Sequence, residues 1–334
     1  MGLHHHRNST TPVGLLSQHA SDARKLKRKP VKTERKPIVK NMKIGILSRG
    51  PQNHSTRSLS EAACNAGHTA EILDPFGFYL HVGGTSNRIT YHGKSVEDVD
   101  VLIPRLSRTT AQYGEEVVAH FEWIGTPVIN RAKPIAAARH KFHSLRILAQ
   151  HGLPIPPSLT VGSSEFLENA VAKTGDYPFI LKPFYGTHGR GVMLIDTPTS
   201  LTSAVDALCD LHHDYVIQPF IVEAGGVDIR VLVVGGEAIA VMKRSAPPGE
   251  FRANIHKGGV GEVVTLPENY INTAIKAAAA LELEIAGVDL LQTNQGPVVL
   301  EVNPSPGFEE LETVTGINIA AVIIEFAAKF TQNR

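Results

Sequence analysis

The segment that most constrains the fold covers residues 287–303, where apolar and polar residues alternate on both sides of a predicted turn. With the turn centred on Gln295, Asp289 faces Glu301 across a β-hairpin, and Asn303 lies two residues further along the same face. The opposite face is predicted to be core and carries Val288, Leu290, Val298, Leu300 and Val302. One face of the hairpin is therefore apolar, and the other gathers oxygen-bearing side chains.

These oxygen-bearing side chains predict a metal site. Carboxylates opposed across a sheet are destabilising unless a cation compensates them, and oxygen ligands without sulfur or histidine suit Mg²⁺. Asp289, Glu301 and Asn303 are therefore the predicted ligands, and the alternative is a solvated sheet face whose acids hold no ion. Leu291 and Val299 share this face by alternation, and we expect Leu291 either to contact an adenine ring or simply to pack.

A lysine inside an apolar strand precedes a glycine-rich loop. Lys182 lies in the predicted strand, where a buried ammonium needs a partner. The loop, residues 185–191, contains Gly186, Gly189 and Gly191, and glycines let backbone amides approach phosphate closely. It joins strand to strand and lacks the G-K-[ST] sequence, so it is neither a Walker loop nor a Rossmann turn. It predicts a phosphate-binding lid, and a plain hairpin turn is the alternative.

The order of predicted elements divides the chain. Strands alternate with helices in residues 42–132, which indicates a parallel sheet with helices on its faces. A helix over residues 134–150 follows and carries Lys141, which taken alone would be an ordinary surface lysine. Hairpins then indicate an α+β region with antiparallel sheets. The expected segments are a basic disordered tail, an α/β domain, a central lobe with the lid and a C-terminal lobe with the metal site, over residues 1–41, 42–132, 133–216 and 217–331.

The first 41 residues are strongly basic. They hold ten Lys or Arg against two acids, and they have too little apolar content to bury a core. A solvated arm, a patch that contacts RNA or the ribosome through phosphate groups, and a targeting peptide all fit this composition.

Cysteine content and hydropathy restrict the compartment. The chain has only Cys64 and Cys209, far apart and without metal-ligand spacing, so a disulfide framework is not expected and a reducing cytoplasm fits. No apolar run reaches the roughly 20 residues of a membrane helix, and no secretory signal is recognisable. We therefore expect a cytoplasmic protein without a membrane partner.

Lys141, Lys182 with its glycine loop, and the acidic hairpin together resemble the ATP-grasp superfamily. Further stretches are similar to the RimK family, and they cover residues 42–49, 71–75, 103–105, 227–235 and 244–259. The similarity extends over about residues 42–331. It implies an α/β and α+β chain, with an N-terminal parallel-sheet (pre-ATP-grasp) domain and two α+β lobes that clamp a nucleotide.

The resemblance also implies an activity. It implies an ATP-dependent, ADP-forming ligase that adds glutamate to the C-terminus of an acidic-tailed small-subunit ribosomal protein, or makes oligoglutamate, through an acyl phosphate. ATP and two Mg²⁺ (or Mn²⁺) would be the cofactors, and the family suggests a tetramer. The alternatives are another ATP-grasp ligase acting on an amino acid, cofactor or carrier protein, a non-catalytic ATP-binding module, and an RNA-binding protein. The sequence leaves open the acceptor amine and the number of residues added.

Matching positions carry implied roles. Lys141 and Lys182 would hold the phosphates, and Glu301 would bridge the two metal ions. The remaining nucleotide contacts would be Pro219 and Phe220 at the adenine hinge, Asp228 at the ribose, and Arg252, Ala253 and Asn254 at the phosphates. Pro219 departs from the family, which typically has an acid at this position, and proline has no N–H to offer the adenine.

The chemistry would depend on cationic side chains. The expected catalytic residues are Arg252, Asn254 and Arg244. Arg252 would stabilise the acyl phosphate, and Arg230 and Arg244 would be carboxylate clamps unless they lie on a solvated strand face. Arg105 is a candidate contact for an acidic acceptor. His256 is a candidate acceptor for the amine proton, with a structural role as the alternative.

Overall fold

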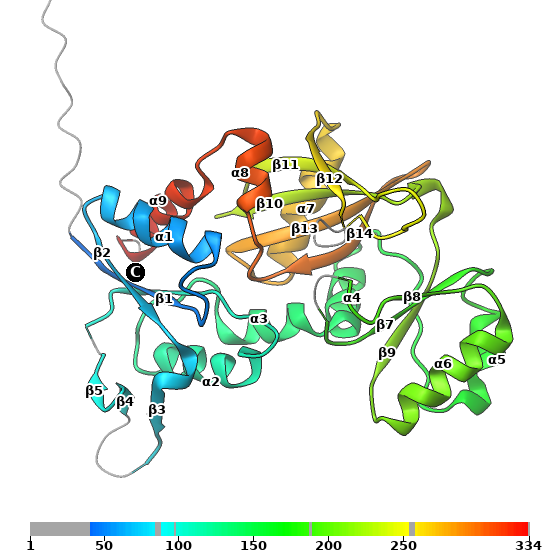
Figure 1. Ribbon diagram of the computed structural model, residues 1–334, viewed down its shortest axis with the longest axis horizontal. Coiled ribbons are helices and arrows are strands. Elements are labelled where there is room, and N and C mark those ends of the chain that lie inside the picture. The colour runs from blue at the N-terminus through cyan, green and yellow to red at the C-terminus, as the bar shows by residue number, and fades with distance from the viewer. Residues whose placement is uncertain (1–40, 84–87, 97, 187–188, 254–257, 333–334) are drawn as a thin grey trace, which may run out of the picture. The chain divides into compact units, whose positions relative to one another are not determined.

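The computed structural model describes residues 41–83, 88–96, 98–186, 189–253 and 258–332. The described chain begins with a three-stranded parallel sheet (Figure 1), whose order is β2 (Thr69–Leu73), β1 (Lys43–Leu47), β6 (Val101–Pro104). The helices that follow its strands are α1 (His54–Asn65) and α2 (Ala111–Trp123). The predicted alternation of strands and helices is confirmed. The predicted strand at 127–130 is wrong, because these residues contribute only an isolated bridge between Val128 and Leu102.

A small antiparallel sheet was not predicted. Its strands, in order, are β3 (Phe78–His81), β4 (Arg88–Tyr91) and β5 (Lys94–Ser95), and they follow the short 3₁₀ helix η1 (Pro75–Gly77). These strands have two to four residues each, which is too short for an alternating pattern to be recognised.

The predicted helix over residues 134–150 is two helices, α3 (Ala132–Arg139) and α4 (Lys141–Gln150). The chain is extended at His140, with φ −85° and ψ 98°, and this residue caps α4. Its Nδ1 accepts a hydrogen bond from the backbone N–H of His143. Because of this break, Lys141 is the first residue of α4 and not an interior helical residue.

A second antiparallel sheet forms the central lobe. Its order is β8 (Met193–Ile195), β7 (Phe179–Pro183), β9 (Tyr215–Pro219). The helices beside it are α5 (Leu167–Val171) and α6 (Pro198–Asp210), with the 3₁₀ helix η2 (Ser164–Phe166) before them (Figure 1). Leu167, Leu201 and Val205 pack against Phe179 and Ile217 in a shared apolar core. The glycine-rich loop connects β7 to β8, as the sequence predicts.

A five-stranded antiparallel sheet forms the C-terminal lobe. Its order is β12 (Val260–Val263), β11 (Glu237–Ser245), β10 (Val227–Val234), β13 (Ile285–Thr293), β14 (Gly296–Asn303). The accompanying helices are η3 (Val222–Ala224), α7 (Glu268–Ala280), α8 (Glu309–Thr315) and α9 (Ile319–Gln332). Ala274 and Ala277 of α7 are fully buried against Val231, Val288 and Leu290 of the sheet. The small alanines allow α7 to pack closely on the strands.

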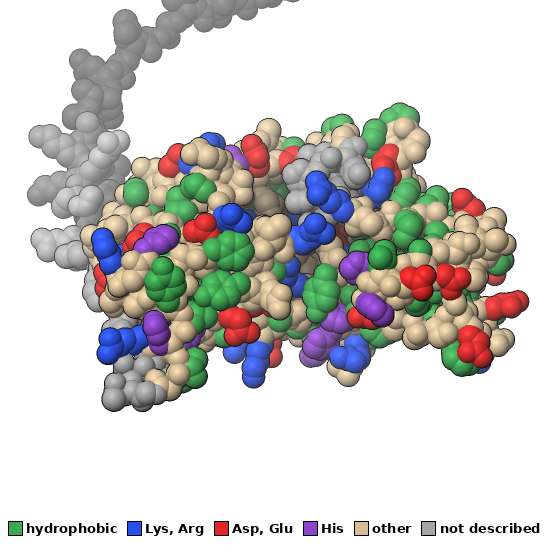
Figure 2. All heavy atoms as spheres, turned by 60° about the horizontal axis from the view of Figure 1, so that its bottom comes forward, with side chains coloured by type: hydrophobic (Ala, Val, Ile, Leu, Met, Phe, Trp, Pro, Cys, Tyr) green, Lys and Arg blue, Asp and Glu red, His purple; other side chains and the backbone are tan. Residues whose placement is uncertain are grey.

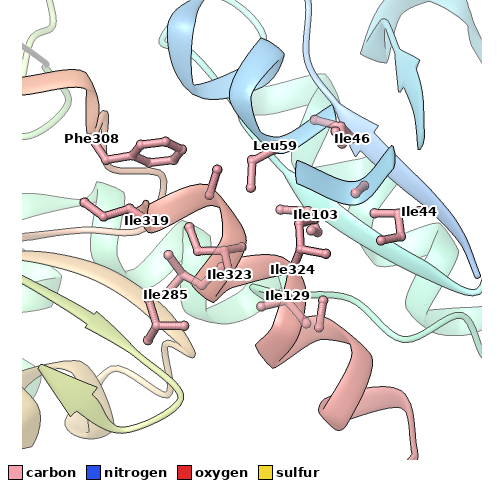
Figure 3. Close-up of a cluster of buried hydrophobic side chains, with 14 of the residues drawn as sticks. Ile44, Ile46, Leu59, Ile103, Ile129, Ile285, Phe308, Ile319, Ile323 and Ile324 are labelled. Atoms are coloured by element: carbon pink, nitrogen blue, oxygen red, sulfur yellow. The ribbon is translucent and has the colours of Figure 1, made fainter. Parts of the chain in front are cut away.

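The last helix connects this lobe to the first sheet. Figure 3 shows Ile323 of α9 toward Ile285 of β13, and Ile324 toward Ile103 of β6. Each of these side chains is no more than 3% exposed, and fully burying one isoleucine contributes about 1.5–3 kcal/mol.

Among the described residues, no single helix has the length and apolarity to cross a membrane, and α8 with α9 meets that test only as a pair bent by 113°.

Candidate active site

The acidic hairpin has the predicted pairing at its centre but a different turn. Thr293 pairs with Gly296, so the turn is the two-residue Asn294–Gln295 connection. A bulge after Asp289 then shifts the register by one residue. As a result Asp289 faces Glu301, and the predicted pairing of these two residues is confirmed.

The bulge changes which apolar residues face the site. Val299 was predicted on the metal face, and Val298 and Leu300 in the core, and these predictions are wrong. Val298 is half-buried and pairs directly with Leu291. Val299 is fully buried in the core with Leu290, whereas Leu300 lines a cleft together with Leu291. Leu300 is the extra residue of the bulge, between Glu301 and Val299, and this one-residue insertion accounts for the exchange of faces.

Three side chains converge on the polar face of the hairpin. The Asn303 side-chain amide lies 3.2 Å from Glu301 Oε1 and 3.4 Å from Asp289 Oδ2, and it also donates to the carbonyl of Gly287. Glu301 is half-buried, and its Oε2 is 3.8 Å from Lys141 Nζ. Asn303 makes these contacts through its Nδ2 donor, so two carboxylates and one amide gather at one point, and groups of these types are ligands that Mg²⁺ prefers. The residues therefore fit the predicted metal, although among the described residues no three His, Cys, Asp or Glu side chains form a metal cluster.

Asp289 is also part of a buried network of charges on β10, β11 and β13. Arg230 donates to both of its carboxylate oxygens, and Arg244 Nη2 lies 3.1 Å from its Oδ2. Arg244 also donates to Asp228 at 2.6 and 2.8 Å. The side chains of these four residues are at most 10% exposed. Two cations and two anions therefore balance inside the sheet, where an unpaired charge would be costly.

The two acids of this network have opposite pKa shifts. Burial alone would raise the pKa of Asp289, but Arg230 and Arg244 outweigh it and hold that pKa at about 2. Burial raises the pKa of Asp228 to about 6, the charge of Asp289 adds to the rise, and Arg244 opposes it. Arg230 and Arg244 thus do clamp carboxylates, but the carboxylates are those of the protein itself.

The opposite wall holds Lys182 through a neutral partner. Lys182 Nζ donates to Gln218 Oε1 at 2.8 Å, and Gln218 Nε2 donates to Ser158 Oγ at 2.8 Å. Burial lowers the pKa of Lys182 to about 8, with Glu301 raising it and Lys141 lowering it further. Sequence reasoning missed Gln218. The available signal was one polar residue in the otherwise apolar strand β9.

Lys141 links the acidic hairpin to the glycine-rich loop. Its Nζ donates to the carbonyl of Gly186 at 2.9 Å and lies 3.8 Å from Glu301. Within the loop, Gly189 and Gly191 have φ values of 66° and 74°, a conformation that favours glycine. A Cβ on Gly191 would also approach Pro183 to 3.2 Å.

A cleft of about 980 Å³, including space open to solvent, brings most of the predicted site together. The predicted residues that line it are Lys141, Lys182, Gly186, Gly189, Pro219, Phe220, Asp228, Arg252, Ala253, Asp289, Leu291 and Glu301. Gly191, Asn303 and Arg244 lie next to these residues in sequence or contact but do not line the cleft. Asn254 and His256 fall outside the described residues. Figure 2 shows Lys and Arg side chains beside a hollow in the middle of one face.

Arg252 connects two loops at this cleft. It forms an ion pair with Glu250 at 2.6 Å and donates to the carbonyls of Gly189 and Val192 at 3.3 and 3.4 Å. Hydrogen bonds from Arg252 hold the pKa of Glu250 at about 2. Glu250 was missed in the sequence, although its position two residues before Arg252 was visible.

Two further predicted contacts, the adenine hinge at Pro219 and Phe220 and the acceptor contact at Arg105, have few free hydrogen-bond donors facing the cleft. Pro219 lines the cleft without an N–H, and the N–H of Phe220 already donates to the carbonyl of Pro178 at 2.9 Å. Arg105 donates to the carbonyl of Pro306 at 2.6 Å, and burial lowers its pKa to about 10. Arg105 does not line this cleft, and its contacts are those of a structural residue.

Comparisons with known proteins agree with this architecture. A model of the RimK-like ATP-grasp domain matches residues 138–327, and a model of the RimK pre-ATP-grasp domain matches residues 42–135. A probable alpha-L-glutamate ligase of Syntrophotalea carbinolica is 41% identical over 291 residues, which cover 87% of this chain and 97% of that protein. A probable alpha-L-glutamate ligase of Halorhodospira halophila is 40% identical over 285 residues, which cover 85% and 94%.

Solved structures show the same fold. The ATP-grasp ligase PsnB complexed with a minimal precursor aligns with a TM-score of 0.67 at 20% identity, over 87% of this chain and 99% of that one. The D-alanine–D-alanine ligase of Bacillus anthracis complexed with ATP aligns with a TM-score of 0.62 at 18% identity, over 87% and 98%. At these identities the likeness establishes the ATP-grasp fold and nothing finer.

Proposed function

The chain belongs to the RimK family of ATP-grasp ligases, and from this premise we propose that it adds glutamate to the C-terminus of an acidic-tailed protein. It is an ATP-dependent, ADP-forming ligase. The proposed acceptor is a small-subunit ribosomal protein, which gains one or more glutamate residues. The names of the relatives, probable alpha-L-glutamate ligases, support glutamate as the substrate.

One observation supports this proposal most directly. Lys141 Nζ lies 2.9 Å from the carbonyl of Gly186 in the glycine-rich loop and 3.8 Å from the Glu301 carboxylate. Groups that the sequence separates by 45 and 160 residues therefore meet at one ammonium. Phosphoryl transfer needs cations beside the transferred group. The Lys141 ammonium and a metal ion held by the Glu301 carboxylate would both reduce the negative charge on that group.

The nucleotide would occupy the cleft of about 980 Å³. We assign its adenine to the region of Pro219, Phe220 and Leu291, and its phosphates to Lys141, Lys182 and the glycine-rich loop. The ribose would lie near Asp228, whose ion pair with Arg244 fixes its carboxylate. Arg252, Ala253 and Asn254 would complete the phosphate contacts.

Asp289, Glu301 and Asn303 would hold two Mg²⁺ or Mn²⁺. A divalent cation there would neutralise charge on the phosphate oxygens. The solved PsnB complex with Mg and ADP supports this use of the fold. Arg230 and Arg244 hold Asp289 in place and thereby fix one side of the site.

The proposed reaction has two steps. An oxygen of the acceptor carboxylate attacks the γ-phosphorus of ATP, the bond to the bridging oxygen breaks, and ADP leaves with that electron pair. The product is an acyl phosphate. The amine of glutamate then attacks the acyl carbon, phosphate leaves with the C–O electron pair, and the amine loses one proton. Lys141, Lys182 and Arg252 would balance the charge, and the loop closing over them would exclude water.

The remaining parts of the proposal concern the surroundings of the enzyme. We propose that the basic residues before position 41 contact the ribosome or RNA, and that the protein is a homotetramer, as the RimK family suggests. We also expect it to work in the cytoplasm, because Cys64 and Cys209 are free thiols.

The test measures ADP release and product mass together. The protein is incubated with ATP, Mg²⁺ and glutamate, with and without small-subunit ribosomal proteins, and each protein is examined for added glutamyl residues. Glu301→Gln should bind ADP in the absence of metal but lose about 100-fold or more of the turnover, because a metal ligand loses its charge. Absence of ADP formation in every mixture with glutamate would contradict the proposed function.

A further inference from the structure

A second cleft adjoins the nucleotide cleft. It has a volume of about 660 Å³, including space open to solvent, and shares Lys141, Gly186, Leu300 and Glu301 with the first cleft. A molecule in the second cleft would therefore lie against the region where the nucleotide phosphates are expected to end. Its size is in the range of small-molecule sites.

The cations in the second cleft lie in two different settings. Among the described residues that line it, the basic side chains are Lys141 and Arg139. Lys141 is at the junction with the nucleotide cleft, bonded to Gly186 and near Glu301. Arg139 lines the second cleft but not the first. The second cleft thus has a cation of its own, in addition to the one it shares.

Arg139 is held by one acid from a neighbouring helix. It is the last residue of α3, and its Nε lies 3.1 Å from Oε1 of Glu115 on α2. The two side chains are 14% and 23% exposed. Burial lowers the pKa of Arg139 and raises that of Glu115, so both charges are costly in this position. A guanidinium has five N–H donors in a planar fork, and one such contact leaves donors for a second carboxylate.

The proposed reaction needs a cation at this place. Glutamate reacts through its amine, which must reach the acyl carbon beside Lys141 and Glu301. Its two carboxylates remain unreacted and carry charge into a partly enclosed cleft, where they need a partner. We propose that the second cleft binds the incoming amino acid and that Arg139 holds one of its carboxylates, with Glu115 fixing the guanidinium. This inference rests on the proposed glutamate ligase function.

Steady-state kinetics of the full-length protein tests the role of Arg139. The native chain is first assayed for glutamate-dependent ADP formation. Arg139→Met should then raise KM for glutamate about 10- to 100-fold, the loss expected for one hydrogen-bonded charge, and leave the Kd for ADP within about twofold. Arg139→Lys should recover part of the loss. The matched control is Arg131→Met, which removes an exposed ion pair with Glu282 just before α3 and should leave KM unchanged.

Two further measurements separate substrate binding from support of the fold. Glu115→Gln keeps a hydrogen-bond acceptor that can hold the guanidinium but removes the competing charge from Arg139. The KM for glutamate should therefore fall, whereas a purely structural pair would give an unchanged or higher KM. Glutamine and isoglutamine, which lack the γ- or the α-carboxylate charge, identify the carboxylate. The native enzyme should discriminate against one of them, and Arg139→Met should lose that discrimination.

The outcomes distinguish the two proposals. If the native protein shows no glutamate-dependent ADP formation, the proposed function and this inference are both overturned. If the native protein uses glutamate but Arg139→Met changes neither its KM nor its discrimination between the amides, the function stands and the inference alone is wrong. Thermal unfolding of each variant identifies any loss that comes from misfolding.

Discussion

The two walls of the proposed nucleotide cleft hold their charges in opposite ways. On the C-terminal sheet, Arg230 and Arg244 are paired with Asp228 and Asp289, and all four side chains are nearly inaccessible to solvent. On the central lobe, Lys182 is held by the neutral oxygen of Gln218 at 2.8 Å. The buried network of the first wall is electrically balanced, whereas Lys182 on the second wall has a neutral hydrogen-bond partner.

This difference separates charged residues that support the fold from charged residues that could bind an anion. A balanced buried network can fix the position of a metal ligand, but it has little charge left to attract an anion. A lysine held by an amide has no acid paired with it, so its charge is available to a phosphate group. Burial of that charge is costly, and it lowers the pKa of Lys182 to about 8. Removal of a cation should therefore cost folding stability on the first wall and nucleotide affinity on the second.

The largest effect is expected from Arg244→Met. Arg244 is 4% exposed and contacts both Asp228 and Asp289, so its removal leaves two buried acids without one of their cations. The free energy of unfolding should fall by about 3–5 kcal/mol. Urea denaturation measures this change. The matched control is the neighbouring Lys243→Met, whose exposed pair with Glu262 should contribute less than about 1 kcal/mol. A similar loss of unfolding free energy in both variants would show that the buried network stabilises the fold no more than an exposed ion pair does.

Lys182→Met should give the reverse result. Loss of one charged hydrogen bond to phosphate should weaken ADP binding about 10- to 100-fold. The unfolding free energy should change much less than in Arg244→Met, because removing the half-buried ammonium relieves its desolvation but also removes its hydrogen bond to Gln218. Calorimetric titration with ADP and urea denaturation measure the two quantities. A destabilised variant with unchanged ADP affinity would make Lys182 a structural residue like Arg244.

The sequence contains different amounts of information about these two walls. The facing of Asp289 and Glu301 was predicted correctly, but only because the bulge after Asp289 restores the register that a turn centred on Gln295 would give. The bulge that moves Leu300 into the cleft was not, because a one-residue shift of the turn leaves the apolar pattern almost unchanged. Lys182 was recognisable as a buried charge in an apolar strand. Its partner Gln218 lies on another strand, and nothing in the sequence specifies that pairing.

The ion pairs of the balanced wall were beyond sequence reasoning for a related reason. Arg230 pairs with Asp289 across 59 residues, and this contact exists only because β10 lies between β11 and β13. The break at His140 was hidden as well, since the apolar pattern continues through it and the extended backbone of that residue is a tertiary effect. Local pattern therefore predicted Asp289, Glu301 and Lys182 as candidate site residues, whereas sheet order determined their partners.

Gln218→Glu would convert the second wall into a balanced one. The new carboxylate would lie where Gln218 Oε1 now accepts from Lys182, so it would pair with the ammonium and raise its pKa. It would also repel the nucleotide, and ADP affinity should fall about 5- to 10-fold. The matched control is Gln295→Glu, an exposed turn residue on the hairpin, which should have no effect. Unchanged ADP affinity in Gln218→Glu would show that the net charge of this wall does not determine binding.

The smallest effect is a dependence of ADP affinity on pH without metal. Lysine binds phosphate in its charged form, and burial lowers the pKa of Lys182 to about 8. The charged fraction falls from roughly three quarters at pH 7.5 to roughly one quarter at pH 8.5, so ADP affinity should fall about threefold across this interval. Binding at pH 8.5 should take up protons, which calorimetry in buffers of different ionisation enthalpy detects. Gln218→Glu raises the pKa of the lysine, so it should move this decline to higher pH, and Lys182→Met should abolish it. A decline that persists in Lys182→Met would assign the titration to another group and remove Lys182 from the comparison.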